Sequence, residues 1–266
     1  MVPASAPPTP SPAAVFLALL RRDLHVARRE LPLVLVRTAL QPLMFVVVFG
    51  YLLPKMGFVS REYGAALVPG ILALSLAFSS VQSVALPMVS EFGVTREIED
   101  RLLAPVPTAL VAAEKVVNGV LQGILAVLFV LPVARLIMGP IPGLAPQSAL
   151  VVLGIVLLGA ATFATLGLVL GTAISPPQIG LMFSVIVGPM VFFGCAYYPW
   201  AGLHVAPVIQ VLVLVNPLVY VSEGMRAALT PGLPHMPLAA VVAALAALSA
   251  LFWGLGLRFF LRRAVG

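Results

Sequence analysis

Long apolar runs dominate the chain, and short polar or proline-rich stretches separate them. A helix needs about 20 apolar residues to cross the ~30 Å hydrocarbon core of a bilayer. Six runs reach this length, which predicts an all-α integral membrane fold with six transmembrane helices. The runs lie at about 31–53, 65–89, 111–136, 148–174, 178–198 and 237–257.

A seventh apolar run, at 205–221, is shorter and is interrupted by Pro207 and Pro217. If this run crossed the membrane, the arginines near the two ends of the chain would face opposite sides. Cytoplasmic loops carry an excess of Lys and Arg, which favours an arrangement that gathers these residues on one side. Backbone that does not span is tolerated at membrane depth where protein covers it. We therefore predict external re-entrant helices over 203–229, before the last span, and both termini in the cytoplasm.

The six-span arrangement divides the basic residues unequally between the two sides. Arg37 lies inside the first run, one to two turns from its cytoplasmic end. We expect its side chain to snorkel to the interface, and the alternative is a role in a substrate path or a partner contact. The predicted outer side holds Lys55, Arg61, Arg135 and Arg226. The predicted cytoplasmic side holds Arg21, Arg22, Arg28, Arg29, Arg96, Arg101, Lys115, Arg258, Arg262 and Arg263.

The chain ahead of the first span divides into two parts. Residues 1–12 are rich in Pro, Ser and Ala, which predicts a disordered tail. Residues 13–30 separate polar from apolar positions at helical spacing, after Ser11 and Pro12 as N-cap and first helical residue. This pattern predicts an amphipathic helix in the cytoplasmic interface, the alternative being a cytosolic extension of the first span. Its apolar face holds Phe16, Leu20, Leu24, Ala27 and Leu31, and its polar face holds Arg22, His25 and Arg29.

Acidic residues concentrate in the loop between the second and third spans. Of the nine in the chain, this loop holds Glu91, Glu97, Glu99 and Asp100. Gly93 can end the second span, Thr95 can cap a new helix, and the prolines of 104–107 stop that helix. Thr108 can then cap the third span. We predict a short, rigid helix at 95–103 that docks on a partner, and the alternative is a plain connector.

Composition agrees with a membrane protein and excludes several kinds of chemistry. The chain is 61% hydrophobic and 9% charged, whereas soluble domains carry about 25% charged residues. Its net charge of +6 comes from arginines that flank apolar runs, which does not suggest a nucleic-acid surface. No phosphate-binding loop of the form GxxxxGK[ST] occurs, the histidines are far apart, and Cys195 is the only cysteine. We therefore expect no catalytic centre, no metal site and no ATP site, so that another polypeptide must supply energy for active transport.

Three stretches make the chain similar to the ABC-2 type permeases, the transmembrane subunits of ATP-binding-cassette exporters. The stretch Glu91–Pro107 resembles the coupling-helix region of that family, with an acidic start and the ending Leu-Leu-Ala-Pro-Val-Pro. Asn216–Arg226 resembles the segment before the last span, and Phe193–Pro199 resembles the exit from the fifth span. The resemblance extends over nearly the whole chain. It implies that residues 31–266 form an ABC-2 type six-helix transmembrane domain.

The resemblance implies a driven transport subunit and not an enzyme. The helix at 95–103 would dock on a separate ATPase, which binds ATP and Mg, while this chain binds no cofactor. Two permease copies, or two related permeases, would pair with two ATPases in the plasma (inner) membrane of a bacterium. The first, second and fifth spans would then reshape a path for an amphiphilic substrate such as a drug, a lipid or a lipid-linked glycan.

The resemblance also implies roles for particular residues. The ATPase-coupling residues are Glu91, Thr95, Arg96, Glu97, Glu99, Asp100, Arg101, Leu102 and Leu103. The external gate holds Tyr198, Pro199, Asn216, Pro217, Tyr220, Glu223 and Arg226. The candidate substrate path holds Phe78, Phe183, Phe192 and Phe193, for which packing against lipid or core is the alternative.

Two other classes of function are alternatives to the ABC-2 permease on the residues alone. A secondary transporter or channel that works without an ATPase would need buried charged or polar pairs, which the sequence does not reveal. A membrane-embedded enzyme or assembly scaffold would need reactive side chains clustered at one depth.

Overall fold

The computed structural model describes residues 11–29, 40, 42–58, 60–93, 95, 107–141 and 143–265, and every regular element within them is helical. The all-α prediction is therefore confirmed for this part of the chain. In chain order the long elements are α1 (Pro12–Arg29), a helix at Pro42–Lys55 ending in α3 (Leu53–Lys55), α4 (Arg61–Gly93), α6 (Thr108–Met138) and α7 (Pro146–Ala173). A helix at Pro176–Phe192 follows, containing α8 (Ile179–Met182) and α9 (Gly188–Phe192), and then α10 (Pro207–Leu212), α11 (Pro217–Leu229) and α12 (Leu238–Val265).

Four helices in the described residues are long and apolar enough to cross a membrane, and a bent pair raises the number to five if it counts as one span. The pair is Pro207–Val215 with Pro217–Leu229, bent by 99°. The helices at Pro42–Lys55 and Pro176–Phe192 are apolar but shorter. The predicted first span begins outside the described residues, and Arg37 lies there too. The six-span count therefore stays a prediction. The four long spans are Ala66–Gly93, Thr108–Met138, Pro146–Ala173 and Leu238–Ala264.

Two predicted boundaries are wrong. The fifth apolar run was expected to stay helical to residue 198, but the helix ends at Phe192. Cys195 then takes φ = 52°, a left-handed conformation that no helix interior contains, and the chain turns. Thr108 does not cap the third span, because it is already the first helical residue of α6 and Pro107 precedes it without a side-chain cap. Gly93 ends α4 as predicted.

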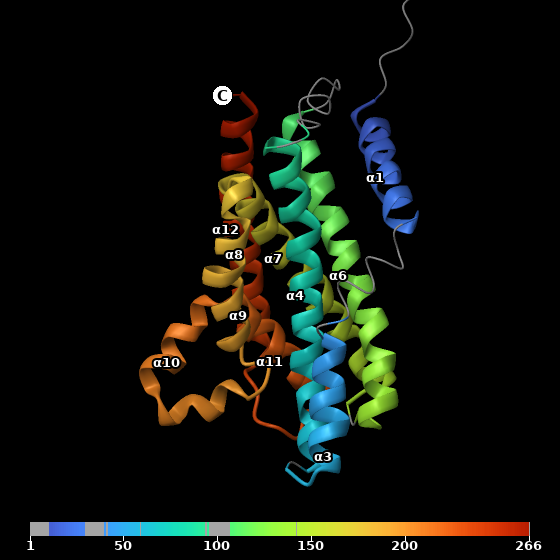
Figure 1. The fold of residues 1–266 in the computed structure, drawn as a ribbon, viewed down its shortest axis with the longest axis vertical. Coiled ribbons are helices and arrows are strands. Elements are labelled where there is room, and N and C mark those ends of the chain that lie inside the picture. Colours follow the sequence, from blue (N-terminus) through green and yellow to red (C-terminus); the bar gives the residue numbers. More distant parts are fainter. Residues whose placement is uncertain are drawn as a thin grey trace, which may run out of the picture.

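Helix α4 is the centre of the bundle (Figure 1). It packs against α6, α7 and α11, and α12 packs mainly against α7. In the most apolar stretch of α4, 83% of the residues are buried inside the protein, compared with 11% in α12. Helix α4 therefore faces protein on most sides, whereas the described part of this chain leaves most of α12 uncovered.

Glycines bring α6 and α7 close to α4. Gly119 and Gly123 lie one turn apart on α6, and a Cβ atom at Gly123 would come within 2.1 Å of Ser80 Oγ on α4. Gly171 on α7 behaves in the same way, since a Cβ there would lie 2.6 Å from Met88 Cβ. Helices in membranes associate through van der Waals packing, which small residues improve by letting the backbones approach. These positions explain how α4, α6 and α7 pack closely against one another.

Helix α1 runs beside the upper part of α6 in Figure 1. Its start agrees with the prediction, because Ser11 Oγ accepts a hydrogen bond from Ala14 N at 3.3 Å. Phe16 and Leu20 are half-buried, whereas Arg22 and His25 are exposed, so the two predicted faces are confirmed at these positions. Leu31 lies outside the described residues, and the interfacial placement of α1 stays a prediction.

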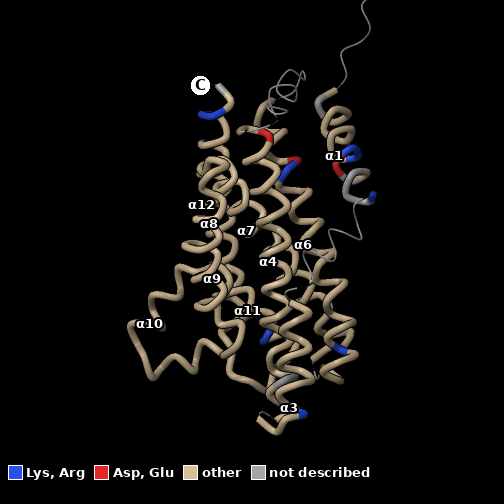
Figure 2. The backbone as a smooth tube through the Cα atoms, in the orientation of Figure 1, with Lys and Arg blue, Asp and Glu red and all other residues tan. Residues whose placement is uncertain are grey.

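Charged residues gather at one end of the bundle (Figure 2). We call this the charged end, and α1, the last turn of α4, the first turns of α6 and the end of α12 meet there. Lys55 and Arg135 lie toward the opposite end. The described charged residues of the charged end include Arg21, Arg22, Asp23, Glu91, Glu114, Lys115, Arg262 and Arg263.

Candidate functional site

The predicted external gate centres on α11, a helix of 13 residues in the half of the bundle away from the charged end (Figure 1). Asn216 caps this helix, since its Oδ1 accepts a hydrogen bond from Leu218 N at 3.0 Å. Pro217 occupies the first helical position, where its missing N–H costs nothing. The Asn216 amide also donates to Met190 O at 2.7 Å, which fastens the start of α11 to α9.

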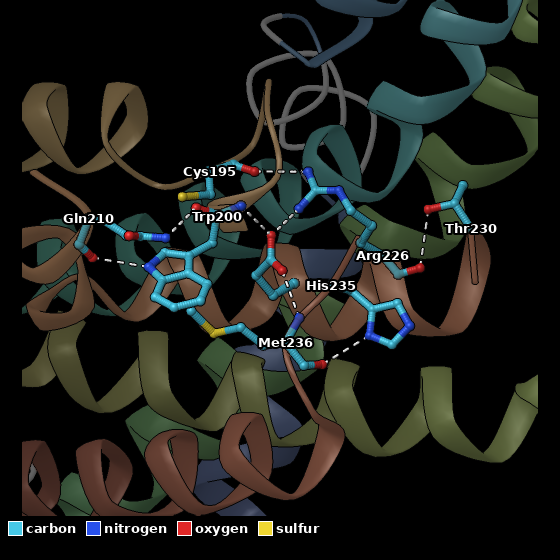
Figure 3. Close-up of polar contacts among 8 residues, drawn as sticks. Cys195, Trp200, Gln210, Arg226, Thr230, His235 and Met236 are labelled. Atoms are coloured by element: carbon cyan, nitrogen blue, oxygen red, sulfur yellow. Dashed lines mark hydrogen bonds and ion pairs between the residues drawn. The ribbon is translucent and has the colours of Figure 1, made fainter. Parts of the chain in front are cut away.

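Glu223 and Arg226 form a buried ion pair on α11, with exposed fractions of 0% and 1%. Glu223 Oε1 accepts from Arg226 Nη1 and from Trp200 N, the latter at 2.9 Å, and Glu223 Oε2 accepts from Met236 N at 2.9 Å. Arg226 Nη2 donates to Cys195 O at 2.9 Å (Figure 3). We call these five residues the Glu223 cluster.

The Glu223 cluster joins α11 to backbone groups that lie 13 to 31 residues away in the sequence. Cys195 lies in the turn after α9, Trp200 begins the 3₁₀ helix Trp200–Val205, and Met236 precedes α12. Burial of a charge is costly unless it is paired and hydrogen-bonded, and each charge here has several partners. The burial of both side chains excludes an exposed surface pair, which would contribute little.

The remaining predicted gate residues lie in or beside the segment between α9 and α11, where several hydrogen bonds join residues close in the sequence. Tyr198 OH donates to Phe192 O at 2.9 Å, and Tyr220 OH donates to Leu214 O at 2.8 Å. Pro199 is the N-cap residue of the 3₁₀ helix at Trp200–Val205. Trp200 itself exchanges hydrogen bonds with Gln210, from its Nε1 to Gln210 O at 3.0 Å and from Gln210 Nε2 to Trp200 O at 3.3 Å (Figure 3). Hydrogen bonds within the segment between α9 and α11 therefore stabilise its conformation.

An aromatic pocket of about 520 Å³ lies between the helix at Pro42–Lys55, α4 and the helix at Pro176–Phe192. Three of the four predicted path residues, Phe78, Phe183 and Phe192, line it. Phe193 does not, and instead lines a separate apolar pocket of about 440 Å³ against α10 and the start of α11. Surfaces of this kind accept apolar or aromatic groups and offer almost no charge.

Sequence reasoning missed three aromatic residues of this pocket, which are Phe45, Phe49 and Tyr197. Their rings contact one another, with centroid distances of 5.3 Å for Phe45–Tyr197 and 6.1 Å for both Phe45–Phe49 and Phe49–Tyr197. Phe45 and Phe49 are four residues apart and share one helical face. That spacing was a usable signal, whereas the approach of Tyr197 depends on the turn after α9.

Lys115 is a further buried charge that sequence reasoning did not single out as a site. Its Nζ lies 2.7 Å from Glu91 Oε1 and 3.2 Å from Asp23 Oδ2, and its side chain is 3% exposed. Buried charged pairs were not expected from the sequence, so this pair and Glu223–Arg226 correct that expectation. The Lys115 contacts join α6 to α4 and α1, whereas Glu223 and Arg226 both lie on α11 and bind the backbone of neighbouring segments.

Most of the predicted ATPase-coupling residues lie outside the described part of the chain. Thr95 is exposed, with its N–H donating to Ser90 O at 3.0 Å, and Glu91 is buried at the end of α4. Outside the described residues lie Arg96, Glu97, Glu99, Asp100, Arg101, Leu102 and Leu103. The segment that contains them starts and ends at the charged end, since it connects α4 to α6.

Comparison with known proteins agrees with this architecture. The family described as ABC-2 type transporter matches residues 14–230. The inner membrane transport permease YadH of Escherichia coli (strain K12) is 28% identical over 213 residues, which cover 77% of this chain and 78% of that protein. The protein of the same name from Shigella flexneri matches to the same extent. The chain therefore belongs to the ABC-2 type transporter family and is a membrane subunit of a transporter.

Proposed function

We propose that this chain is the permease subunit of an ABC exporter that moves an amphiphilic substrate, such as a drug, a lipid or a lipid-linked glycan, across the inner membrane of a bacterium. The family match over residues 14–230 carries the proposal. The printed name of the relative YadH, an inner membrane transport permease, supports the location. The absence of a phosphate-binding loop from the sequence supports a separate ATPase, which binds the ATP and Mg.

The proposed topology has six spans and a cytoplasmic charged end. In Figure 1 the chain alternates in direction through the helix at Pro42–Lys55, α4, α6, α7, the helix at Pro176–Phe192 and α12. Helix α1 and the end of α12 lie at the same end of the bundle, and basic residues favour the cytoplasmic side. The bend of 99° between Pro207–Val215 and Pro217–Leu229 supports a re-entrant external element.

The ATPase docks on the segment between α4 and α6 in this proposal. Its residues 95–103 carry both acids and arginines, and both ends of the segment leave the charged end of the bundle. A short charged element can fit a cleft in a soluble partner through complementary charges, which fix register and orientation. A second permease copy, or a related permease, and a second ATPase complete the transporter.

The double substitution Glu97→Lys plus Glu99→Lys is expected to abolish assembly with the ATPase. Two charges that face the partner would be reversed, and like charges brought together at an interface cost several kcal/mol. The measurement is recovery of a co-expressed ATPase subunit with the affinity-tagged permease in mild detergent. We expect recovery to fall at least tenfold.

The matched control reverses two exposed charges at the opposite end, Lys55→Glu plus Arg135→Glu. This control should retain the ATPase at the level of the unaltered chain. Full recovery of the ATPase with the Glu97→Lys, Glu99→Lys chain would exclude the docking role. Substrate flux in liposomes that contain the permease alone would instead favour a secondary transporter or channel.

The aromatic pocket is the proposed entry point for the substrate. It is lined by six aromatic side chains, it is apolar, and it lies at the junction of the helices that the family resemblance places along the path. Aromatic pairs contribute about 0.5–1.5 kcal/mol beyond the burial of their area, so each ring should contribute measurably to binding an aromatic amphiphile. The lining aromatics are Phe45, Phe49, Phe78, Phe183, Phe192 and Tyr197.

Phe183→Ala is expected to raise the half-maximal concentration at which rhodamine 6G stimulates ATP hydrolysis by the reconstituted transporter. The loss of one aromatic contact corresponds to a change of roughly 2- to 13-fold. Leu181→Ala is the matched control, because Leu181 lies on the same helix but is 62% exposed and does not line the pocket. Equal responses of the two variants would contradict a binding role for the pocket.

A further inference from the structure

An open hollow of about 390 Å³ lies at the charged end, where α12 and α7 both end. Arg262 and Arg263, in the basic last turn of α12 (Figure 2), line it together with Phe259 of the same helix. Thr172 and Ala173 of α7 form the opposite wall. No carboxylate is among these lining residues, so the hollow presents two cations to any molecule that enters it.

Arg263 is held in place by the ends of two other helices. Its Nη1 donates to Thr172 O and Ile174 O at 3.0 and 3.2 Å, and its guanidinium lies 4.9 Å from the centroid of the Phe92 ring. These hydrogen bonds use only one of the three guanidinium nitrogens, which together carry five N–H donors. Arg263 therefore contributes a fixed cation that has further donors available.

Arg262 is the cation that no part of the described chain neutralises. Its side chain is exposed and forms no ion pair or hydrogen bond with a described residue. A guanidinium is planar and weakly hydrated, and its paired N–H groups match two oxygens of a phosphate. Arg262 is thus available to bind a phosphate-bearing molecule from outside the chain.

The length of α12 places Arg262 at the depth of lipid headgroups. The apolar span Leu238–Ala264 has 27 residues, which corresponds to about 40 Å of helix. The hydrocarbon core of a bilayer is only ~30 Å thick, a distance that about 20 residues cross. If the span enters the core at Leu238, Arg262 lies roughly one helical turn beyond the opposite edge, where lipid phosphates are found.

An apolar stripe runs from the hollow along the same face of α12. Leu251 and Leu255 are 53% and 36% exposed, and their helical spacing places them on the face that carries Arg262. In the most apolar stretch of α12, only 11% of the residues are buried within the described part of the chain. A cationic hollow at headgroup depth, continued by an exposed apolar stripe, matches the two ends of one phospholipid molecule.

We infer that the hollow between α7 and α12 binds the phosphate headgroup of an anionic phospholipid, whose acyl chain lies along Leu251 and Leu255. Arg262 and Arg263 bind the phosphate, and the bound lipid holds the end of α12 beside the end of α7. Basic pockets between transmembrane helices bind anionic headgroups for the same electrostatic reason. The site requires no ATPase, so it goes beyond the proposed function and is tested separately from it.

Native mass spectrometry of the full chain, purified and delipidated in detergent, tests the inference. Titration with dioleoylphosphatidylglycerol gives the dissociation constant of the first bound lipid. Dioleoylphosphatidylcholine is titrated in parallel, because it has the same acyl chains but a choline cation that offsets the phosphate charge. We expect phosphatidylglycerol to bind at least about tenfold more tightly, since only its headgroup carries a net negative charge to pair with the arginines.

Arg262→Gln should weaken the binding of phosphatidylglycerol by roughly tenfold, because a charge-assisted contact to the phosphate is lost. Arg262→Lys keeps the charge but not the planar fork, and its affinity should lie between the two. Ala173→Phe leaves every charge in place and fills the hollow from the α7 side, so it should weaken binding as strongly as Arg262→Gln. Arg262 and Ala173 are both exposed, so these variants should elute from size exclusion like the unaltered chain.

Arg258→Gln is the matched control. Arg258 is an exposed arginine one turn before Arg262 on α12, but it does not line the hollow. Its loss should change the affinity by less than about threefold, because a charge outside the site is screened. Equal weakening by Arg258→Gln and Arg262→Gln would instead indicate diffuse attraction and would overturn the inference.

Three other results would also overturn it. The first is equal affinity for phosphatidylglycerol and phosphatidylcholine, or unchanged affinity in both Arg262→Gln and Ala173→Phe. The second is complete displacement of phosphatidylglycerol by an equal concentration of glycerol 3-phosphate, which would assign the hollow to a soluble anion. The third is a dimer that forms without bound lipid and dissociates in Arg262→Gln, which would assign this face of α12 to a second copy of the chain.

Discussion

Arg226→Met is expected to lower the midpoint of thermal unfolding by roughly 6 to 20 °C. The substitution removes the cation from the Glu223 cluster and leaves the Glu223 carboxylate with an uncompensated charge at 0% exposure. Removing one partner of a buried ion pair costs about 3–5 kcal/mol, and each kcal/mol shifts the midpoint by about 2–4 °C in a chain of this size. The Cys195 carbonyl also loses its donor.

The measurement is the temperature dependence of the monodisperse peak in fluorescence-detected size-exclusion chromatography. Arg258→Met on α12 is the control, since Arg258 is exposed and its loss should change the midpoint by less than about 2 °C. Glu223→Gln should also lower the midpoint, because its single amide oxygen replaces only one of the two oxygens that accept from Trp200 N and Met236 N, and Arg226 is left without a carboxylate. A wild-type midpoint for Arg226→Met would show that the pair does not support the fold.

Gly70→Ala is expected to disturb both the aromatic pocket and the Glu223 cluster. A Cβ atom at Gly70 of α4 would lie 1.8 Å from Ala196 O, so the turn after α9 has to move. Ala196 lies between Cys195, whose carbonyl binds Arg226, and Tyr197, whose ring contacts Phe45. Overpacking of this kind typically costs 1–3 kcal/mol, which corresponds to a decrease of roughly 2 to 12 °C in the unfolding midpoint.

Gly154→Ala on α7 provides a control with the opposite sign. Nothing lies within 4 Å of a Cβ atom at that position, so the alanine meets open space. Alanine is favoured over glycine inside a helix by roughly 0.5–1 kcal/mol, so this variant should match or exceed the stability of the unaltered chain. In the reconstituted transporter, Gly70→Ala should also raise the half-maximal concentration of rhodamine 6G, whereas Gly154→Ala should leave it unchanged. Similar behaviour of the two variants would contradict the close approach at Gly70.

Hydrophobic runs were sufficient to predict the long helices. The runs at 65–89, 111–136, 148–174 and 237–257 lie within α4, α6, α7 and α12, apart from terminal residues, because an apolar run of that length has few alternatives to a helix in lipid. The run at 178–198 was overextended for the same reason. Its last residues are as apolar as the others, and apolarity alone contains no information on where the backbone turns.

The site was less predictable, since its contacts join residues that are distant in the sequence. The Asn216–Pro217 pair is a local signal for the start of a helix, and Asn216 caps α11. The burial of Glu223 depends on Trp200 and Met236, which no spacing rule connects to it. Lys115 appeared only as one more cytoplasmic cation, because its partners become neighbours only when α1, α4 and α6 pack together.

The dimensions of α11 also determine when it can be completed during biosynthesis. Its 13 residues span about 20 Å, which is too short for a hydrocarbon core of ~30 Å, and they include a charged pair. The apolar surroundings of α11 come from α4, α7 and α12. Since α12 is translated after α11, and Met236 just before α12 completes the bonds to Glu223, α11 reaches its packed position only after the last helix has left the ribosome. Premature termination within α12 should therefore expose the Glu223–Arg226 pair to the machinery that degrades unassembled membrane proteins.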